Sequence, residues 1–309
     1  MDMYQKREMR KNKKMNEDTK SLSSTSINWY PGHMTKALRQ MKEDIKLIDV
    51  VIELIDARIP YSSKNPDIDK LAENKKRVIL LNKSDMADDR LTKHWKEHYE
   101  SIGYAVAIIN SKTGNGIKAI NDLVLKVCAE KIAKDRAKGI LNRPIRAMIV
   151  GIPNVGKSTF INSFAGKACA KTGNKPGVTK GKQWIRLNKN VELLDTPGVL
   201  WPKFEDQQVG LRIAWIGSIN EDILNPYDLA VKLCEYLYQN YPGILNTKYG
   251  IEECESGEEM LLRLAVKRAC LLKGGVPDTN RVAIFVMDDF KNGRIGKITA
   301  EKPEDRTNG

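Results

Sequence analysis

The sequence has few cysteines, few aromatic residues and no long hydrophobic run. Its five cysteines never form a C-x-x-C pair, so we expect them to be reduced, mostly buried, and neither zinc ligands nor disulfides. No stretch of about eighteen residues is apolar without interruption, which excludes a membrane-spanning helix. The polar, basic start lacks the apolar centre of a secretory signal, so we expect the chain to stay in the cytoplasm.

Length and composition indicate folded domains behind a disordered arm. The chain has 309 residues, 41% of them hydrophobic, which is enough for one large core or two smaller ones. Residues 1–27 are rich in Lys, Asn and Ser and poor in large apolar groups, so we expect a disordered basic arm there. The hydrophobic pattern changes again near residue 203, which predicts one domain over 28–203 and a second over 204–309.

The positive charge is concentrated in one part of the chain. The net charge is +13, and residues 131–190 alone hold fourteen Lys and Arg against one acid, Asp135. A surface of this sign attracts a polyanion such as nucleic acid, although a solvated charged face would have the same composition.

The first domain has the pattern of an α/β fold with a mostly parallel sheet. Apolar runs of strand length end at small, polar or turn-forming residues at 50–55, 78–81, 105–109, 145–150 and 191–194. Helical spacing predicts helices over 33–48, 117–134 and 158–164. Continuous apolar strands that alternate with helices are typical of a sheet that is covered on both faces.

The second domain is predicted to be helical and smaller. Residues 227–241 and 258–273 have helical periodicity, with breakers at Pro242-Gly243 and Gly274-Gly275. The run 282–287 has the composition of a strand, but Asp278 or Thr279 as N-cap and Gly293 as terminator favour a helix.

Residues 151–158, with the sequence G-I-P-N-V-G-K-S, match the phosphate-binding loop G-x-x-x-x-G-K-[ST] between a predicted strand and a predicted helix. Such a match arises by chance at a rate of about 0.02 in a chain of this length. Its backbone N–H groups would hold phosphates, Lys157 would reach the terminal phosphates, and the Ser158 hydroxyl would bind Mg²⁺. The nucleotide-binding residues expected here are Asn154, Val155, Gly156, Lys157, Ser158 and Thr159.

The sequence N-K-S-D at Asn82, Lys83, Ser84 and Asp85 indicates which base is bound. The Asp85 carboxylate can accept from N1–H and the 2-amino group of guanine, whereas adenine has no donor at either place. The motif therefore favours GTP over ATP, the alternative being a polar turn at a strand end. Ser111 and Lys112, also at a strand end, have the form of a loop that contacts the base.

Asp195-Thr196-Pro197-Gly198 follows another predicted strand and matches D-x-x-G. There Asp195 would position Mg²⁺ and the Gly198 N–H would sense the γ-phosphate. Thr179, in the loop between the two phosphate motifs, would close on Mg²⁺ when the γ-phosphate is present, although an ordinary turn threonine fits the loop equally well.

These motifs occur in a permuted order, because GTP-binding switch proteins normally place N-K-x-D after D-x-x-G. Together with W-Y-P-G-H-M at 29–34, this order resembles the bacterial ribosome biogenesis GTPase A family of circularly permuted P-loop GTPases. The resemblance covers roughly 28–201 and extends more loosely through the helical part. The chain after D-x-x-G leads into the helical domain, so loss of the γ-phosphate would pull on that domain unless the connection is a passive tether.

The resemblance implies a cytoplasmic GTPase that binds the large ribosomal subunit precursor and its rRNA and promotes a late maturation step. Val199 and Leu200 stand where many such enzymes have a water-orienting glutamine, so we expect slow turnover, on the order of 10⁻³ per second, that rises on the partner. The family implies a catalytic role for His33 and a K⁺ ligand at Asn154; local packing and loop stabilisation are the alternatives.

The family's C-terminal domain resembles an RNA-binding module, and we expect no membrane contact and a monomer. The cations that would serve RNA there are Lys267, Arg268, Arg281, Lys291, Arg294 and Lys297. Two other functions remain open: a signalling switch with a protein partner and a GTP-using tRNA-modification factor.

Overall fold

The computed structural model describes residues 32–166, 183–219 and 224–306. The predicted arm, residues 1–27, lies outside these ranges, as do Thr179 and Cys169. Among the described cysteines, Cys128 and Cys234 are buried and Cys254 and Cys270 are partly exposed. In the described part of the chain, no helix has the length and apolarity needed to cross a membrane.

A six-stranded sheet with the order β3-β2-β1-β4-β6-β5 forms the centre of the first domain. Its strands are Val50–Asp56 (β1), Lys76–Asn82 (β2), Ala105–Ile108 (β3), Ile145–Val150 (β4), Gln183–Arg186 (β5) and Val191–Asp195 (β6). The first four of these strands and β6 pair in parallel, which confirms the predicted parallel α/β fold. Only β5, which the sequence did not predict, runs antiparallel to its neighbour.

The permuted chain closes one continuous sheet at the pairing between β1 and β4. Val50 lies opposite Lys76 of β2 on one side and opposite Ala147 of β4 on the other. Every residue of β1 is buried. Because β1, β2, β4 and β6 are parallel, the residues that follow them meet at one edge of the sheet, where ligands bind in such folds.

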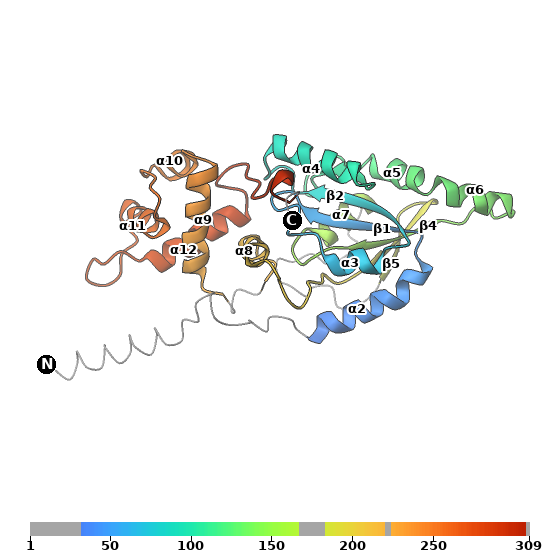
Figure 1. The fold of residues 1–309 in the computed structure, drawn as a ribbon, viewed down its shortest axis with the longest axis horizontal. Coiled ribbons are helices and arrows are strands. Elements are labelled where there is room, and N and C mark those ends of the chain that lie inside the picture. The colour runs from blue at the N-terminus through green and yellow to red at the C-terminus, as the bar shows by residue number, and fades with distance from the viewer. Residues whose placement is uncertain (1–31, 167–182, 220–223, 307–309) are drawn as a thin grey trace.

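Helices cover both faces of the sheet (Figure 1). They are α2 (Gly32–Asp44), the 3-10 turn η1 (Ile45–Leu47), α3 (Pro66–Leu71), α4 (Asp89–Ser101), α5 (Ile120–Val127), α6 (Ala129–Ala137) and α7 (Lys157–Ala165). The predicted helix 33–48 is confirmed as α2 and η1, and the predicted helix 117–134 divides into α5 and α6. Trp95 and Tyr99 of α4 pack against Ile55, Ile79 and Leu81 in one apolar cluster.

The second domain is helical, as predicted, and lies at one end of the molecule (Figure 1). Its helices are α8 (Gln207–Trp215), α9 (Pro226–Asn240), α10 (Ile244–Tyr249), α11 (Gly257–Lys267), α12 (Thr279–Lys291) and the 3-10 turn η3 (Pro303–Arg306). The Asp278 side chain accepts from the Arg281 N–H and caps α12, so the prediction of a helix over 282–287 is confirmed. One apolar core runs from β4 and β6 into α8, α9, α11 and α12.

The prediction of a helix over 258–273 is wrong for its last six residues. The helix α11 ends at Lys267, and Ala269 takes a left-handed conformation with φ 51°. The Leu272 N–H then donates to the Val276 oxygen across a tight turn that contains Gly274 and Gly275. The helical spacing that includes Arg268 and Leu272 continues past the point where the backbone hydrogen bonds leave the helix.

Candidate nucleotide-binding site

The phosphate-binding loop connects β4 to α7 through backbone conformations that favour glycine. Gly151 has φ 148°, and a Cβ atom there would lie 2.4 Å from the Leu54 oxygen of β1. Gly156 has φ 96° and precedes the first residue of α7. Asn154 also has a positive φ, 62°, which is uncommon for a residue with a side chain. The loop therefore passes close to β1 and ends at a helix N-terminus, an arrangement that suits an anion.

Lys157, the first residue of α7, folds back over this loop. Its Nζ donates to the oxygens of Gly151, at 3.0 Å, and Ile152, at 2.8 Å. The side chain is almost fully buried, and burial lowers the pKa of Lys157 to about 8, against the attraction of Asp195. Ser158 and Thr159 follow on the same helical turn and are partly buried. The Lys157 ammonium thus lies over the loop, where it could donate hydrogen bonds to the oxygens of the expected phosphates.

Asp195 ends β6 and is buried near Lys157. Among the described residues, its Oδ1 atom has no hydrogen-bond partner. Burial raises the pKa of Asp195 to about 6, and the Lys157 charge opposes this shift. Because this folded-state pKa lies above the ordinary value of 3.8, ionised Asp195 costs stability above about pH 6 and the cost disappears below about pH 4. Among the described residues this buried carboxylate oxygen is unpartnered, and a carboxylate oxygen is a ligand of the kind that Mg²⁺ prefers.

The D-x-x-G segment touches the phosphate-binding loop directly. A Cβ atom at Gly198 would lie 2.8 Å from Lys157 Nζ and 2.8 Å from Pro153. The Val199 N–H donates to the Gly151 oxygen at 3.3 Å, and Val199 and Leu200 are buried. Buried aliphatic side chains cannot orient a water molecule, so the structure leaves that role to another group.

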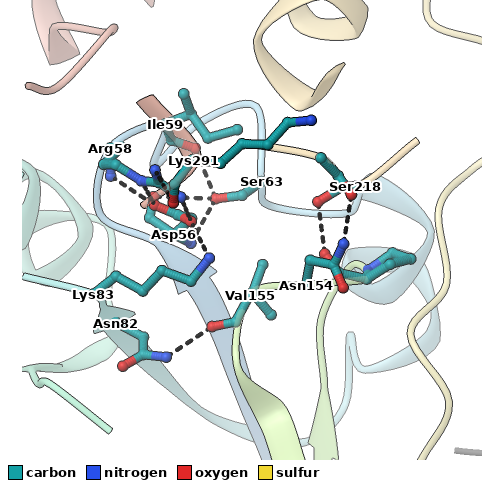
Figure 2. Close-up of polar contacts among 12 residues, drawn as sticks. Asp56, Arg58, Ile59, Ser63, Asn82, Lys83, Asn154, Val155, Ser218 and Lys291 are labelled. Atoms are coloured by element: carbon teal, nitrogen blue, oxygen red, sulfur yellow. Dashed lines mark hydrogen bonds and ion pairs between the residues drawn. The ribbon is translucent and has the colours of Figure 1, made fainter. Parts of the chain in front are cut away.

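Asn82 joins the three motifs predicted to surround the nucleotide. Its Nδ2 donates to the Val155 oxygen of the phosphate-binding loop at 2.7 Å, as Figure 2 shows. Its Oδ1 accepts from the Ser111 N–H at 3.0 Å and from the Ser111 hydroxyl at 2.8 Å. Asn82 and Ser111 are buried. One side chain thereby fixes the N-K-S-D loop, the Ser111 loop and the phosphate-binding loop relative to one another.

Asp85 and Lys112 are exposed at this edge of the sheet. The Asn110 side chain accepts from the N–H groups of Lys112, at 2.8 Å, and Thr113, at 3.1 Å, which shapes the loop that carries Ser111. The geometry therefore leaves the Asp85 carboxylate open to a ligand while the backbone beside it is held by buried hydrogen bonds.

Of the two residues expected to act in catalysis or K⁺ binding, His33 and Asn154, the structure describes the side-chain contacts of Asn154 alone. His33 belongs to the first turn of α2, and its side chain lies outside the described part of the structure. The Asn154 Nδ2 donates to the Gly217 oxygen at 2.5 Å, and the Ser218 hydroxyl donates to the Pro153 oxygen at 2.6 Å. The phosphate-binding loop is therefore tied to the turn that follows α8 (Figure 2).

The sequence did not predict a role in the site for Asp56, the last residue of β1, or for Arg58, two residues later. The fully buried Asp56 forms an ion pair with Lys83 of N-K-S-D at 2.9 Å and another with Arg58 at 2.8 Å. A signal was present, because Asp56 directly follows an apolar run that is parallel to the strand before Asn82. No known nucleotide motif marks it, and sequence reasoning treated it as an ordinary strand-end residue.

Two of the predicted RNA-binding cations of the second domain form ion pairs within the protein, and a third lies over an aromatic ring but stays exposed. Arg294 pairs with Asp288 and Asp289, and Lys297 pairs with Asp89 at 2.7 Å. The Arg268 guanidinium stacks 3.8 Å from the Phe285 ring centre. Arg294 and Lys297 therefore contribute less free charge than the sequence suggested.

Known proteins share this arrangement over most of the chain. A sequence model described as a 50S ribosome-binding GTPase matches residues 146–257. The chain is 50% identical over 280 residues to ribosome biogenesis GTPase A of Bacillus cereus, and the matched region covers 90% of this chain and 95% of that protein. The corresponding protein of Thermotoga maritima is 34% identical, with 91% of this chain and 96% of that protein covered.

Solved structures agree with the sequence relatives. The GNP-bound crystal structure of YlqF from T. maritima has a TM-score of 0.61 and 30% identity, and covers 87% of this chain and 99% of that one. A GDP-bound structure of YlqF has a TM-score of 0.63 and covers 86% of this chain and all of that one. This chain is a member of the ribosome biogenesis GTPase A family.

Proposed function

We propose that this GTPase binds the precursor of the large ribosomal subunit and promotes a late maturation step, with its nucleotide state coupled to the helical domain. The main support is that Asn82 joins the loops expected to contact the base to the phosphate-binding loop. That bridge supports a GTP site whose two halves lie at one edge of one sheet. The ribosomal partner is inferred from the family, whose relatives are named for ribosome biogenesis.

Within this proposal each motif has a separate task. Asp85 accepts from guanine, the N–H groups from Val155 to Thr159 bind the phosphates, and Lys157 neutralises the terminal ones. Mg²⁺, when bound, would supply positive charge to the phosphates, and Ser158 and Asp195 would hold it, together with Thr179 if that loop closes. The Lys157 ammonium donates to the Gly151 and Ile152 oxygens in this structure. When phosphates bind, it would move toward them and pair its positive charge with their negative charge.

Hydrolysis would depend on groups that the partner helps to place. Val199 and Leu200 are buried, so the water-positioning role falls to His33 in this proposal. Asn154 would face a K⁺ ion through its Oδ1, since its amide nitrogen is engaged with Gly217. Comparing hydrolysis in KCl and in NaCl tests the K⁺ role, because equal rates in both salts would remove it.

Contact with rRNA would use exposed cations on both domains. On the first domain they are Lys134, Arg136, Lys138, Arg186 and Lys189, and on the second domain Lys267, Arg268 and Arg281. Such contacts to phosphates predict that association weakens steeply as the salt concentration rises.

The discriminating experiment is GTP hydrolysis measured with purified large subunits, with small subunits and with neither. We expect stimulation by large subunits only, and loss of all GTP binding in Lys157→Ala. Association that is insensitive to salt and to RNase would instead indicate a protein partner and a signalling switch. A steady product other than GDP and phosphate would indicate a tRNA-modification factor.

A further inference from the structure

The C-terminal end of α12 lies against the loop that carries Asp85. Gly293, which follows this helix with φ 68°, is so close to Met86 that an added Cβ would lie 2.6 Å from Met86 Cγ. The Ile298 N–H donates to the Met86 oxygen at 3.0 Å, and the Asp88 N–H donates to the Thr299 hydroxyl at 3.1 Å. The residues immediately after the guanine-reading carboxylate are thus packed and hydrogen-bonded to the second domain.

Arg58 connects the same helix end to the first domain (Figure 2). Its buried Nη1 donates to the oxygens of Phe290, at 2.9 Å, and Lys291, at 3.1 Å. Carbonyls in the last turn of a helix lack intrahelical donors, and the helix dipole places partial negative charge there. A guanidinium is well suited to this position because it carries several donors and a permanent positive charge.

The other side of the Arg58 guanidinium holds Asp56. Nε donates to Oδ1 at 2.9 Å and Nη2 donates to Oδ2 at 2.8 Å, which is a two-point contact. Although burial alone would raise it, the charges of Arg58 and Lys83 hold the pKa of Asp56 well below its usual range. Asp56 is therefore a fixed anion between two cations.

Lys83 completes the chain of contacts that begins at α12. Its Nζ lies 2.9 Å from Asp56 Oδ2, and its backbone takes a left-handed conformation with φ 60°. That conformation is unfavourable for a residue with a Cβ and persists only where its surroundings enforce it. Lys83 stands between Asn82, which binds the phosphate loop, and the exposed Asp85.

We propose that Arg58 is a positioning residue for guanine binding, and that the C-terminal end of α12 holds Arg58 in place. Docking of the helical domain then sets the position of the Asp85 carboxylate through Asp56 and Lys83. This inference rests on the proposed function, because it takes Asp85 as the group that reads guanine. The two domains would then be connected in two places: through the chain that follows D-x-x-G, and through these contacts beside the guanine-binding loop.

The test compares binding of GDP and IDP, because inosine lacks the 2-amino group that Asp85 is expected to bind. The two nucleotides carry the same ribose and diphosphate, so a general loosening of the site lowers both affinities alike. We expect the wild type to prefer GDP, and Arg58→Met to reduce this preference by about tenfold, equivalent to one charge-assisted hydrogen bond. Gly293→Ala, which pushes on Met86, should reduce it in the same direction.

Matched controls separate positioning from loss of stability. Arg212→Met removes a second arginine, which is partly buried, pairs with Glu301 at 3.4 Å and holds the same C-terminal segment without contacting Asp56. Gly274→Ala places a side chain at φ 93° where nothing lies within 4 Å. Both controls should keep the wild-type preference for GDP. Where Arg58→Met does not fold, Arg58→Lys and Gly293→Ala give the same comparison.

Each outcome decides a separate question. A wild type that binds GDP and IDP equally would overturn the assignment of Asp85 and with it the proposed site. A wild type that prefers GDP, with folded Arg58 and Gly293 variants that keep this preference, would overturn the positioning role alone. An equal loss of preference in Arg212→Met would also overturn it, because a change that leaves Arg58 and Asp56 in contact would then have the same effect.

Discussion

Replacing Asn82 with alanine tests the bridge between the base-reading and phosphate-binding loops. The change removes the bond from Nδ2 to the Val155 oxygen, at 2.7 Å, and both bonds from Ser111 to Oδ1. Each such bond contributes a net of about 0.5–1.5 kcal/mol, and the groups left behind are buried. We therefore expect the free energy of unfolding to fall by about 3 kcal/mol.

The same change should weaken nucleotide binding, because the three loops would no longer share a fixed point. We expect the Kd for GDP to rise by at least about tenfold, measured by fluorescence titration beside urea unfolding. Asn188→Ala is the matched control, since Asn188 also accepts from two N–H groups, of Asn190 and Val191, and donates to Asn121. Asn188 is exposed in the turn between β5 and β6, before the first residue of β6, whereas the nucleotide motifs follow the last residues of the parallel strands. If Asn82→Ala binds GDP as tightly as Asn188→Ala, the bridge does not organise the site.

Three further changes probe the phosphate end. Asp195→Asn should stabilise the nucleotide-free protein by on the order of 1 kcal/mol above about pH 6, and should not stabilise it below about pH 4. Thermal unfolding measured across this pH range tests this, and a difference that does not change with pH would contradict a buried carboxylate that ionises. Gly198→Ala should abolish hydrolysis by displacing Lys157, while Gly210→Ala, whose Cβ meets only the Phe204 ring, should not. His33→Ala should lower subunit-stimulated hydrolysis with unchanged GTP affinity, and full turnover would exclude that histidine.

The parallel strands were predictable because each is an apolar run closed by a polar or small residue. The edge strand β5 was not, since Q-W-I-R is short and lies in the basic stretch. Its Trp184 is exposed and its Ile185 buried, so only one face contributes to the core. The end of α11 was missed because side-chain spacing does not report Ala269, whose left-handed backbone stops the helix.

The site was predictable where motifs carry the chemistry, and not where tertiary contacts do. Asn82, Ser111 and Val155 were expected near one another from their strand ends, and their hydrogen bonds agree. Arg58 gave no signal, because its partners, the oxygens of Phe290 and Lys291, are far along the chain and belong to the backbone. Any residue type at those two positions would offer the same acceptors.

The pairing of β1 with β4 has a consequence for how the chain folds. The register joins Val50 to Ala147, so the middle of the sheet forms only through a contact between distant parts of the sequence. Until β4 pairs with it, β1, whose residues are all buried in the folded protein, presents an open edge, and such edges template intermolecular association. Nascent or thermally opened chains should therefore aggregate through this strand, and slow, nonlocal closure should limit refolding.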